Sequence, residues 1–247
     1  MSACFTAVEI EINHACNRRC SYCPNSVSKR KSTGEIDPAL FERLLSELKN
    51  FSFDGRISYD FYNEPLLHSD FEGIVAQTRA HLPRASIVVY TNGTLLTPGR
   101  VEKLLGLGVN ELVVTQHERD AGYEFERVYE ALAPGPRGRV KYRTHRELNL
   151  TNRGGMLPHL GREGLMLAPC YIPSMVVTVT VSGNVLPCFE DYEEELVMGN
   201  LNESSLLEIW NSEKFVRFRR DLKLGQRHAH VPCKSCNRHE SLHTARA

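Results

Sequence analysis

The stretch CNRRCSYCPN (residues 16–25) contains three of the eight cysteines in this 247-residue chain. They follow the pattern C-x3-C-x2-C, as Cys16, Cys20 and Cys23. Three thiolates are one ligand short of a closed tetrahedral zinc site, and on a [4Fe–4S] cluster they leave one iron without a protein ligand. An open coordination position is typical of a catalytic metal centre, so the stretch predicts a reactive cluster. Zinc with His14 as the fourth ligand is the alternative, but only one residue separates His14 from Cys16, which is unlike the usual zinc spacings.

The chain is balanced in charge, with 30 basic and 30 acidic side chains, and 41% of its residues are hydrophobic. These values are ordinary for a globular protein and give no net field that would attract nucleic acid or an anionic membrane. The first residues carry no signal-peptide pattern, and no apolar run reaches the roughly 18 residues of a membrane span. We therefore expect a cytoplasmic protein that binds neither nucleic acid nor membrane. In that reducing compartment, metal binding is favoured over disulfides for clustered cysteines.

Strand-like and helix-like segments alternate through the first part of the chain. Apolar and polar residues alternate in AVEIEIN (7–13), which predicts a strand running into the cysteine loop. IDPALFERLLSELKN (36–50) has helical apolar spacing, and its Asp37 and Pro38 suit the N-cap and the first helical position. The repetition predicts an α/β fold, an open partial (β/α)6 barrel over residues 1–155 with helices outside a parallel sheet. The other expected strands are 56–62, 86–91, 110–116, 138–143 and 147–150, and the other expected helices are 68–82, 97–106 and 123–133.

Residues 156–247 are expected to form a second, smaller unit. Residues 152–170 are rich in glycine and proline and predict a connection to it. MVVTVTVSGNVLPCF (175–189) predicts a β-hairpin that turns at its Ser-Gly-Asn sequence. The apolar spacing of residues 206–225 predicts one helix that ends at a glycine.

A second group of cysteines lies in this C-terminal part: Cys170, Cys188, Cys233 and Cys236. Four thiolates brought together would complete a closed metal site. From spacing alone, structural zinc and an iron–sulfur cluster are equally compatible with this group. The remaining Cys4 is expected to be a small apolar filler at the start of the first strand.

CNRRCSYC resembles the CxxxCxxC signature of the radical S-adenosylmethionine (SAM) superfamily, including an aromatic residue, Tyr22, before the last cysteine. The resemblance implies a [4Fe–4S] cluster on the three cysteines that binds SAM, and reductive cleavage of SAM to a 5′-deoxyadenosyl radical. YNEP (62–65) is similar to the GGEP-type segment that meets the SAM amino group in this superfamily. The SAM-binding residues implied in this way are Tyr22, Asn63, Glu64, Thr91, Asn92, Gln116 and His117.

The second cysteine group resembles the twitch extension of radical SAM enzymes, a shortened SPASM domain that holds one auxiliary cluster. This resemblance implies that the four cysteines bind a second [4Fe–4S] cluster, and it favours the cluster over zinc. Because the protein supplies all four ligands, the auxiliary cluster is expected to exchange electrons rather than to bind substrate.

Further segments, in the same order along nearly the whole chain, resemble the radical SAM dehydrogenases of aminoglycoside antibiotic biosynthesis. They include FYNEPLL (61–67), YTNGTLLT (90–97), LTNRGG (150–155) and GNVLPCFED (183–191). The resemblance implies oxidation of a secondary alcohol of an aminocyclitol or aminosugar to a ketone, with flavodoxin or ferredoxin as reductant. No G-x-G-x-x-G motif follows a strand, so a nicotinamide cofactor is not expected.

The same resemblance places Arg153, Glu190 and Tyr62 against the substrate. A guanidinium group stays protonated, so Arg153 is better suited to orient the hydroxyl group than to remove its proton. Glu190 could pair with a substrate amine, and Tyr62 is expected to flank the substrate. Each residue also has a structural interpretation: a surface arginine, a member of a solvated acidic run, and a packing tyrosine.

Three other functions remain open from the sequence. An epimerase of an aminoglycoside sugar carbon would begin identically, but it needs a thiol to return a hydrogen atom, and only Cys4 is unassigned. A peptide-modifying enzyme commonly carries an additional leader-peptide-binding domain, for which we expect no room in this chain. A non-enzymatic binding module would hold two zinc ions and cleave no SAM.

Overall fold

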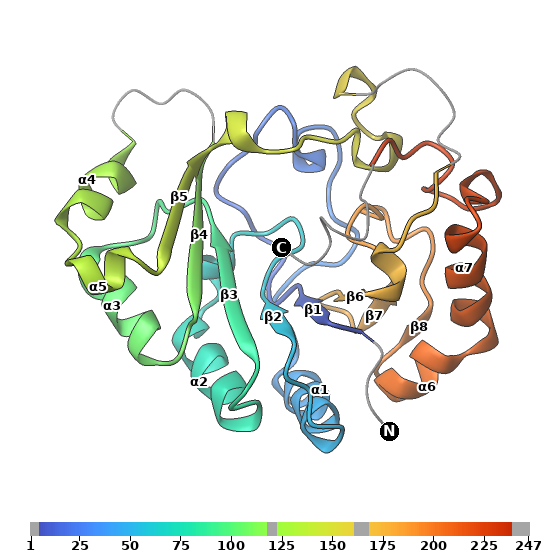
Figure 1. Cartoon of the computed structure of the whole chain (residues 1–247), viewed down its shortest axis with the longest axis horizontal. Coiled ribbons are helices and arrows are strands. Elements are labelled where there is room, and N and C mark those ends of the chain that lie inside the picture. Colours follow the sequence, from blue (N-terminus) through green and yellow to red (C-terminus); the bar gives the residue numbers. More distant parts are fainter. Residues whose placement is uncertain (1–4, 118–122, 161–167, 239–247) are drawn as a thin grey trace.

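A mostly parallel sheet of eight strands runs through the protein, which a computed structural model describes for residues 5–117, 123–160 and 168–238 (Figure 1). The strand order is β5-β4-β3-β2-β1-β6-β7-β8. All neighbours from β5 to β6 pair in parallel, and β7 and β8 continue the sheet antiparallel. The strands are β1 (Ala7–Ile10), β2 (Arg56–Ser58), β3 (Ser86–Thr91), β4 (Glu111–Gln116), β5 (Val140–Thr144), β6 (Val176–Val179), β7 (Asn184–Leu186) and β8 (Gly199–Asn200). The α/β class predicted from the sequence is confirmed.

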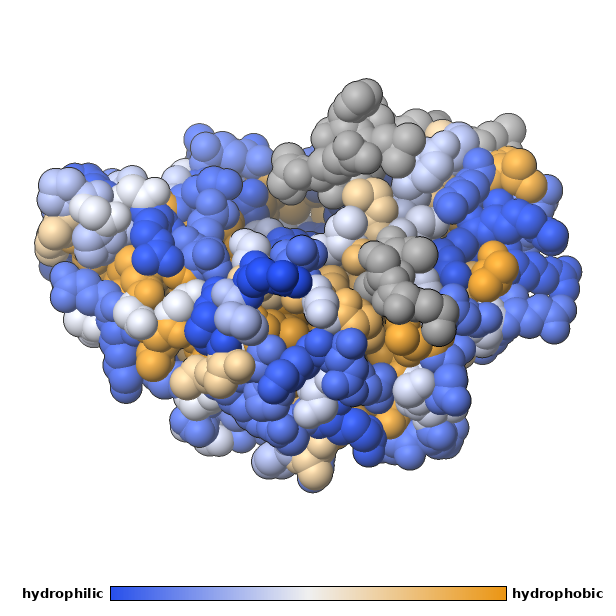
Figure 2. Space-filling view, turned by 60° about the horizontal axis from the view of Figure 1, so that its bottom comes forward, coloured by the Kyte–Doolittle hydropathy of each residue, from blue (hydrophilic) through white to orange (hydrophobic). Residues whose placement is uncertain are grey.

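The helices cover the outer side of the curved sheet (Figure 1). In the described residues they are α1 (Pro38–Asn50), α2 (Phe71–His81), α3 (Pro98–Gly106), α4 (Glu124–Ala131), α5 (Pro134–Arg137), α6 (Leu206–Asn211) and α7 (Glu213–Lys223). The start of α1 is as predicted, because the Asp37 carboxylate accepts the backbone N–H groups of Ala39 and Leu40 at 2.9 and 3.0 Å. None of the described helices is long and apolar enough to cross a membrane. The face turned forward in Figure 2 is mostly hydrophilic, with hydrophobic residues in separate patches.

Both faces of β1 are buried, because this strand lies in the middle of the sheet. Val8 and Ile10 pack into the hydrophobic core that the sheet shares with the helices. Glu9 and Glu11 point to the other side, inside the curved sheet, and are 5% and 0% exposed. The polar residues of the alternating pattern that predicts this strand therefore face the interior of the barrel and not the solvent.

The strand predicted at 147–150 is wrong. β5 ends at Thr144, and residues 145–147 form a single 3-10 turn. The Glu147 carboxylate accepts the backbone N–H of Thr144 at 2.6 Å, and this capping contact ends the strand. The sixth parallel strand is instead β6, which pairs with β1, so the sheet runs across the predicted division at residue 155.

The single helix predicted over 206–225 is two helices, α6 and α7. Ser212 between them has an extended backbone (φ −60°, ψ 148°), which interrupts the helical hydrogen bonds. Its hydroxyl group accepts the backbone N–H of Phe215 at 3.3 Å and so caps α7. Apolar spacing continues through such a break, and the serine before Glu213 is the only local signal of it.

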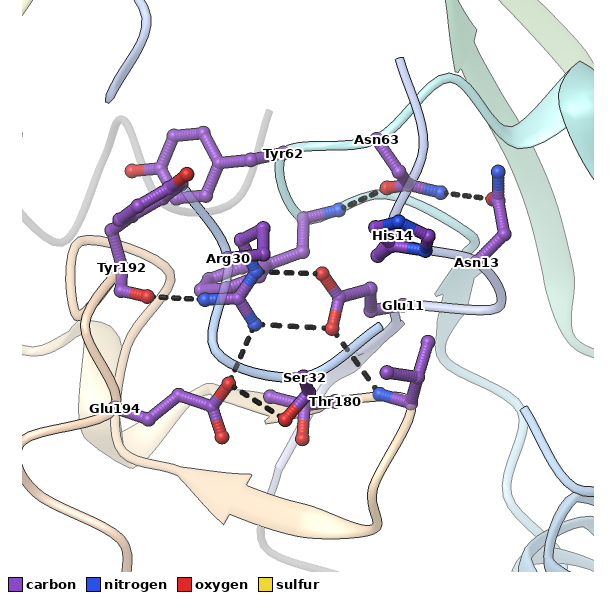
Figure 3. A network of polar contacts seen from close by, with 12 residues as sticks. Glu11, Asn13, His14, Arg30, Ser32, Tyr62, Asn63, Thr180, Tyr192 and Glu194 are labelled. Atoms are coloured by element: carbon purple, nitrogen blue, oxygen red, sulfur yellow. Dashed lines mark hydrogen bonds and ion pairs between the residues drawn. The ribbon is translucent and has the colours of Figure 1, made fainter. Parts of the chain in front are cut away.

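Arg30 ties the segment after the cysteine loop to β1 and to the C-terminal part of the chain (Figure 3). Its guanidinium group donates to both carboxylate oxygens of Glu11, at 3.0 and 3.1 Å, and to Glu194 at 2.7 Å. It also donates to the backbone carbonyl of Tyr192. The side chains of Arg30, Glu11 and Glu194 are only 2%, 0% and 4% exposed, so water cannot replace a lost partner.

Replacing Arg30 with alanine is expected to lower the free energy of unfolding by about 3–5 kcal/mol, because Glu11 would stay buried without a counterion. Urea-induced unfolding of the anaerobically purified protein measures this difference. Lys31→Ala is the matched control, since the Lys31 side chain is 59% exposed and its ammonium nitrogen lies 3.9 Å from a carboxylate oxygen of Glu193. Its loss should cost less than about 1 kcal/mol. Equal effects of the two substitutions would contradict the role given to Arg30.

Candidate active site

A cavity of about 480 Å³ opens where the parallel strands end. Loops converge at the carboxyl ends of parallel strands, which is where α/β proteins bind ligands. Cys16, Cys20 and Cys23 lie on its wall, in the loop after β1. The other lining residues are Glu9, Arg18, Tyr22, Asp60, Phe61, Tyr62, Asn63, Glu64, Tyr90, Thr91, Asn92, Thr115, His117, Arg143, Leu148, Arg153, Phe189 and Arg238.

Glu64 is fixed by three hydrogen bonds after the end of β2. Its Oε1 accepts from the Thr91 hydroxyl group at 2.6 Å and from the backbone N–H of Leu66 at 3.2 Å. Its Oε2 accepts from the backbone N–H of Asn92 at 2.8 Å. Burial raises the pKa of Glu64, although the hydrogen bonds from Thr91 and Asn92 act in the opposite direction. Three of the predicted SAM-binding residues therefore form one preorganised unit on the cavity wall.

Asn63, Tyr22 and His117, three more of the residues expected to bind SAM, also lie on the cavity wall. The Asn63 amide nitrogen donates to the side-chain oxygen of Asn13 at 2.8 Å (Figure 3), and its oxygen accepts the backbone N–H of Phe61 at 2.9 Å. These bonds hold the turn after β2. The Tyr22 hydroxyl group lies 2.6 Å from Nδ1 of His117 and joins the cysteine loop to the end of β4.

Gln116 does not line the cavity, in contrast to the prediction. Side chains alternate along a strand, so Thr115 faces the cavity and Gln116 faces the helices. There Oε1 of Gln116 accepts a hydrogen bond from the Tyr142 hydroxyl group at 3.2 Å. The Thr115 hydroxyl group accepts from Nε of Arg143, also at 3.2 Å. Thr115 is thus the residue of this strand end that is placed for ligand contact.

Tyr62 and Arg153 meet on the cavity wall, where the guanidinium carbon lies 5.8 Å from the centre of the tyrosine ring. The Tyr62 hydroxyl group is buried and has no hydrogen-bond partner among the described residues. Burial, and next the Glu190 carboxylate, raise the pKa of Tyr62 well above its usual range. Burial acts to lower the pKa of Arg153, but Tyr62 and Glu190 more than offset it and the pKa is raised. Both side chains therefore keep their protons at neutral pH and are available as hydrogen-bond donors.

Two glycines place Arg153 against the C-terminal part of the chain. Arg153, Gly154 and Gly155 have positive φ angles of 51°, 65° and 100°. A Cβ atom at Gly154 would lie 2.8 Å from the backbone oxygen of Glu190, so only glycine allows this close approach. The side-chain nitrogen of Asn152 donates to the backbone oxygen of Ser235 at 2.7 Å and fixes the start of this loop.

Glu190 lies behind the cavity wall and also borders the cavity of the second cysteine group. It is 2% exposed. Its Oε1 accepts from Nε of Arg238 at 2.7 Å and from the Thr151 hydroxyl group at 2.9 Å, and lies 3.7 Å from Nη1 of Arg153. Its Oε2 is buried and has no hydrogen-bond partner among the described residues. Glu190 therefore aligns two guanidinium groups that line the large cavity, from which it is itself set back.

The four C-terminal cysteines line one small cavity of about 20 Å³: Cys170, Cys188, Cys233 and Cys236. Three N–H donors point at sulfur here. The Arg227 guanidinium group lies 3.6 Å and the Arg238 backbone nitrogen 3.4 Å from Sγ of Cys236, and the Glu190 backbone nitrogen lies 3.4 Å from Sγ of Cys188. Burial raises the pKa of Cys233 to about 12 and that of Cys236 to about 11. N–H groups directed at sulfur favour the thiolate form, which a cluster requires.

Neither cysteine group surrounds a single ion. In residues 5–117, 123–160 and 168–238, no three His, Cys, Asp or Glu side chains lie close enough together to hold one metal ion. Nδ1 of His14 accepts the backbone N–H of Gly34 at 2.7 Å, and His14 does not border the large cavity. Thiols that surround a shared space without meeting at one point fit the corners of an iron–sulfur cluster better than a tetrahedral zinc ion.

Several charged residues on the cavity wall are absent from the sequence-based prediction. They are Glu9, Arg18, Asp60, Arg143 and Arg238. For Glu9 a signal exists, because it is a charged residue at an alternate position of a strand in the middle of the sheet. The others stand in loops or at strand ends, where neither spacing nor alternation separates a cavity residue from a solvated one.

Comparison with known proteins identifies the family to which this chain belongs. Residues 10–133 match the family model of the radical SAM superfamily, and residues 170–237 match SPASM, described as an iron–sulfur cluster-binding domain. The chain belongs to the radical SAM superfamily. It is 46% identical over 237 residues to the S-adenosyl-L-methionine-dependent 2-deoxy-scyllo-inosamine dehydrogenase of Niallia circulans, which covers 96% of this chain and 94% of that relative.

Solved structures agree with this assignment. The crystal structure of BtrN in complex with AdoMet and 2-DOIA has 45% identity and a TM-score of 0.91, covering 96% of this chain and 95% of that one. BtrN in an open conformation has 38% identity and a TM-score of 0.76, covering 96% and 94%. This chain is thus closer in shape to the ligand-bound structure. SuiB from Streptococcus suis, 13% identical with a TM-score of 0.55 over 93% of this chain and 75% of that one, shares the fold alone.

The comparisons confirm the radical SAM fold, the SPASM-type C-terminal part and the resemblance to SAM-dependent dehydrogenases. They also support iron–sulfur clusters and SAM as the cofactors. Each cysteine group borders a cavity, the first on the wall of the large one and the second around the small one.

Anaerobically reconstituted protein is expected to bind about eight irons and eight sulfides per chain, four of each in every cluster. Cys16→Ala should lower both values to about four, because only the first cysteine group is damaged. Cys4→Ser is the control and should keep about eight. Stoichiometric zinc in place of iron, measured by elemental analysis, would contradict the cluster assignment.

Proposed function

We propose that this chain oxidises a secondary alcohol of an aminocyclitol or aminosugar to a ketone in aminoglycoside antibiotic biosynthesis, using SAM and two [4Fe–4S] clusters. The observation that carries the proposal is the position of the large cavity. The first cysteine group lies on its wall, and Arg153 and Arg238 on that wall are held by Glu190, which also borders the second cysteine group. The Niallia circulans relative, matched over nearly its full length, is a SAM-dependent 2-deoxy-scyllo-inosamine dehydrogenase.

Converting a secondary alcohol to a ketone removes a hydrogen atom from carbon, a proton from oxygen and one electron. When bound, SAM and the first cluster would supply the 5′-deoxyadenosyl radical that takes the hydrogen atom, and the second cluster would supply the electron acceptor. Arg153 would orient the hydroxyl group and stabilise negative charge on its oxygen as the proton leaves. Tyr62, whose hydroxyl group has no partner among the described residues, would donate a second hydrogen bond. Glu190 acts as a positioning residue that fixes the direction of Arg153 and Arg238.

The cysteine positions favour dehydrogenation over epimerisation. In the described part of the chain, every cysteine borders one of the two cavities assigned to clusters. Only Cys4, which lies outside the described residues, is left as a thiol that could return a hydrogen atom to carbon. An epimerase would need that thiol beside the substrate.

The function is tested by incubating the reconstituted enzyme with SAM, dithionite and 2-deoxy-scyllo-inosamine, and analysing the products by mass spectrometry. We expect a ketone that is two hydrogens lighter than the substrate, formed together with 5′-deoxyadenosine. In deuterium oxide, a product with one carbon-bound deuterium and an unchanged oxidation state would instead establish epimerisation.

The same assay separates the two cysteine groups. Cys188→Ala should still cleave SAM but should lower ketone formation at least tenfold, because the electron acceptor is lost while the first group is intact. Cys4→Ser should form ketone at the wild-type rate. Normal ketone formation by Cys188→Ala would contradict the electron-accepting role of the second cysteine group.

We further propose that the enzyme works in the cytoplasm with flavodoxin or ferredoxin as reductant. A groove of about 340 Å³ beside Cys16 is lined by the basic residues His14, Arg18, Arg19 and Lys29 and, among the described residues, by no acidic one. Arg30 also borders it, but its charge is balanced by Glu11 and Glu194. Such a groove next to a cluster ligand would attract the acidic surface of an electron-carrier protein.

Lys29→Glu is expected to raise the flavodoxin concentration needed for half-maximal SAM cleavage about threefold or more at low salt. Cleavage driven by dithionite should be unchanged, and the difference should shrink at high salt because exposed charges are screened. Lys49→Glu, at the exposed end of α1, is the control. If both variants weaken flavodoxin-driven cleavage equally, the groove is not the docking site.

A further inference from the structure

Asp60 lies on the wall of the large cavity, in the segment that follows β2. Its Oδ1 atom is buried and accepts no hydrogen bond from the described residues. Glu64, four residues later, differs in that both of its oxygens accept hydrogen bonds from the protein. A buried carboxylate oxygen without a donor is unfavourable unless a ligand supplies that donor.

Arg56 is the main cation acting on Asp60, but its hydrogen bonds go elsewhere. Nη2 of Arg56 donates to Oε1 of Glu9 at 2.9 Å, and Nη1 donates to the hydroxyl groups of Ser58 and Tyr90 at 3.2 and 3.4 Å. Glu9 and Asp60, both on the cavity wall, therefore share one guanidinium group. Burial, followed by repulsion from Asp60, raises the pKa of Glu9 to about 7.

The four guanidinium groups that line the cavity have partners of their own. Nε of Arg143 donates to the Thr115 hydroxyl group. Arg153 and Arg238 pair with Glu190. Arg18 donates to the backbone oxygen of His117 at 2.9 Å. Burial raises the pKa of Asp60 as well as that of Glu9, so a cation bound beside them would stabilise their charged forms. The guanidinium groups on the wall are engaged by other partners.

We propose that Asp60 binds the ammonium group of the substrate and so sets the preference of the enzyme for an amino-substituted cyclitol or sugar. The inference rests on the proposed function and identifies the side chain that recognises the amine of the substrate. An ammonium group brings three N–H donors and one positive charge. It would fill the open position on Oδ1 and balance the two carboxylates that share Arg56. A hydroxyl group at the same place would bring one donor and no charge, so it would bind less well.

The test compares two substrates, 2-deoxy-scyllo-inosamine and its analogue in which a hydroxyl group replaces the amine. For the wild type, kcat/KM is expected to favour the amine. Asp60→Asn should reduce this preference about 10- to 100-fold, the size expected for the loss of a charged hydrogen bond. The loss should appear mainly in KM of the amine, because Asp60 is assigned to binding and not to the reacting carbon. The iron and sulfide content and the circular dichroism spectrum of Asp60→Asn should equal those of the wild type, which checks that the variant is folded and holds its clusters.

Asp54→Asn, in the exposed turn before β2, is the matched control and should keep the wild-type preference. An unchanged preference in Asp60→Asn would overturn the inference. If the wild type oxidises both compounds equally well, Asp60 does not read the amine, although the proposed alcohol oxidation stands. If the wild type cleaves SAM but oxidises neither compound, the proposed function fails and the inference fails with it.

Discussion

The parallel pairing of β6 with β1 is the contact on which the active site depends. β1 leads directly into the loop of Cys16, Cys20 and Cys23, and β6 opens the hairpin that ends near Cys188. When these strands lie side by side, two groups of thiols that are more than a hundred residues apart in sequence face the same region. An alcohol held between them would be within reach of both reactive centres. One continuous sheet thus joins the two parts of the chain that carry the cysteine groups.

This arrangement places charged groups inside the curved sheet, and Glu11 is the one with the most complete set of local partners. Glu11 would be costly at 0% exposure, but Arg30 binds both of its oxygens and the backbone N–H of Val181 approaches at 3.2 Å. The same arginine binds Glu194 of the C-terminal part (Figure 3). The network therefore holds the β6–β7 hairpin against β1 at the height of the cysteine loop. Its value lies in orientation, since an apolar pair of the same size could fill the space but would not define the angle between the two parts.

Sequence reasoning predicts the parallel sheet, most helices and both cysteine groups, because these depend on local periodicity and on thiol spacing. Its errors have local causes. A capping glutamate ends β5 before the expected strand at 147–150, and Ser212 divides a helix whose apolar spacing is continuous. For Gln116 the strand was predicted correctly, but one residue of register decides which side chain reaches the cavity. The charged residues of the cavity wall are harder to predict from the sequence, since side chains from five strands and their loops meet there only after folding.

The short segment from Tyr59 to Glu64 suggests how one fold can keep its cofactor chemistry and change its substrate. Both carboxylate oxygens of Glu64 and both side-chain polar atoms of Asn63 make hydrogen bonds to neighbouring parts of the protein. Substitution there would disturb the backbone on which cofactor binding depends. Asp60 and Tyr62 instead each present a polar atom that no described residue binds. Replacing Asp60 or Tyr62 would weaken the binding of a ligand that contacts these atoms, but it would leave the surrounding hydrogen bonds intact. In the proposed function, the unsatisfied polar atoms of Asp60 and Tyr62 therefore meet the substrate, and the satisfied atoms of Glu64 and Asn63 hold the cofactor-binding wall in place.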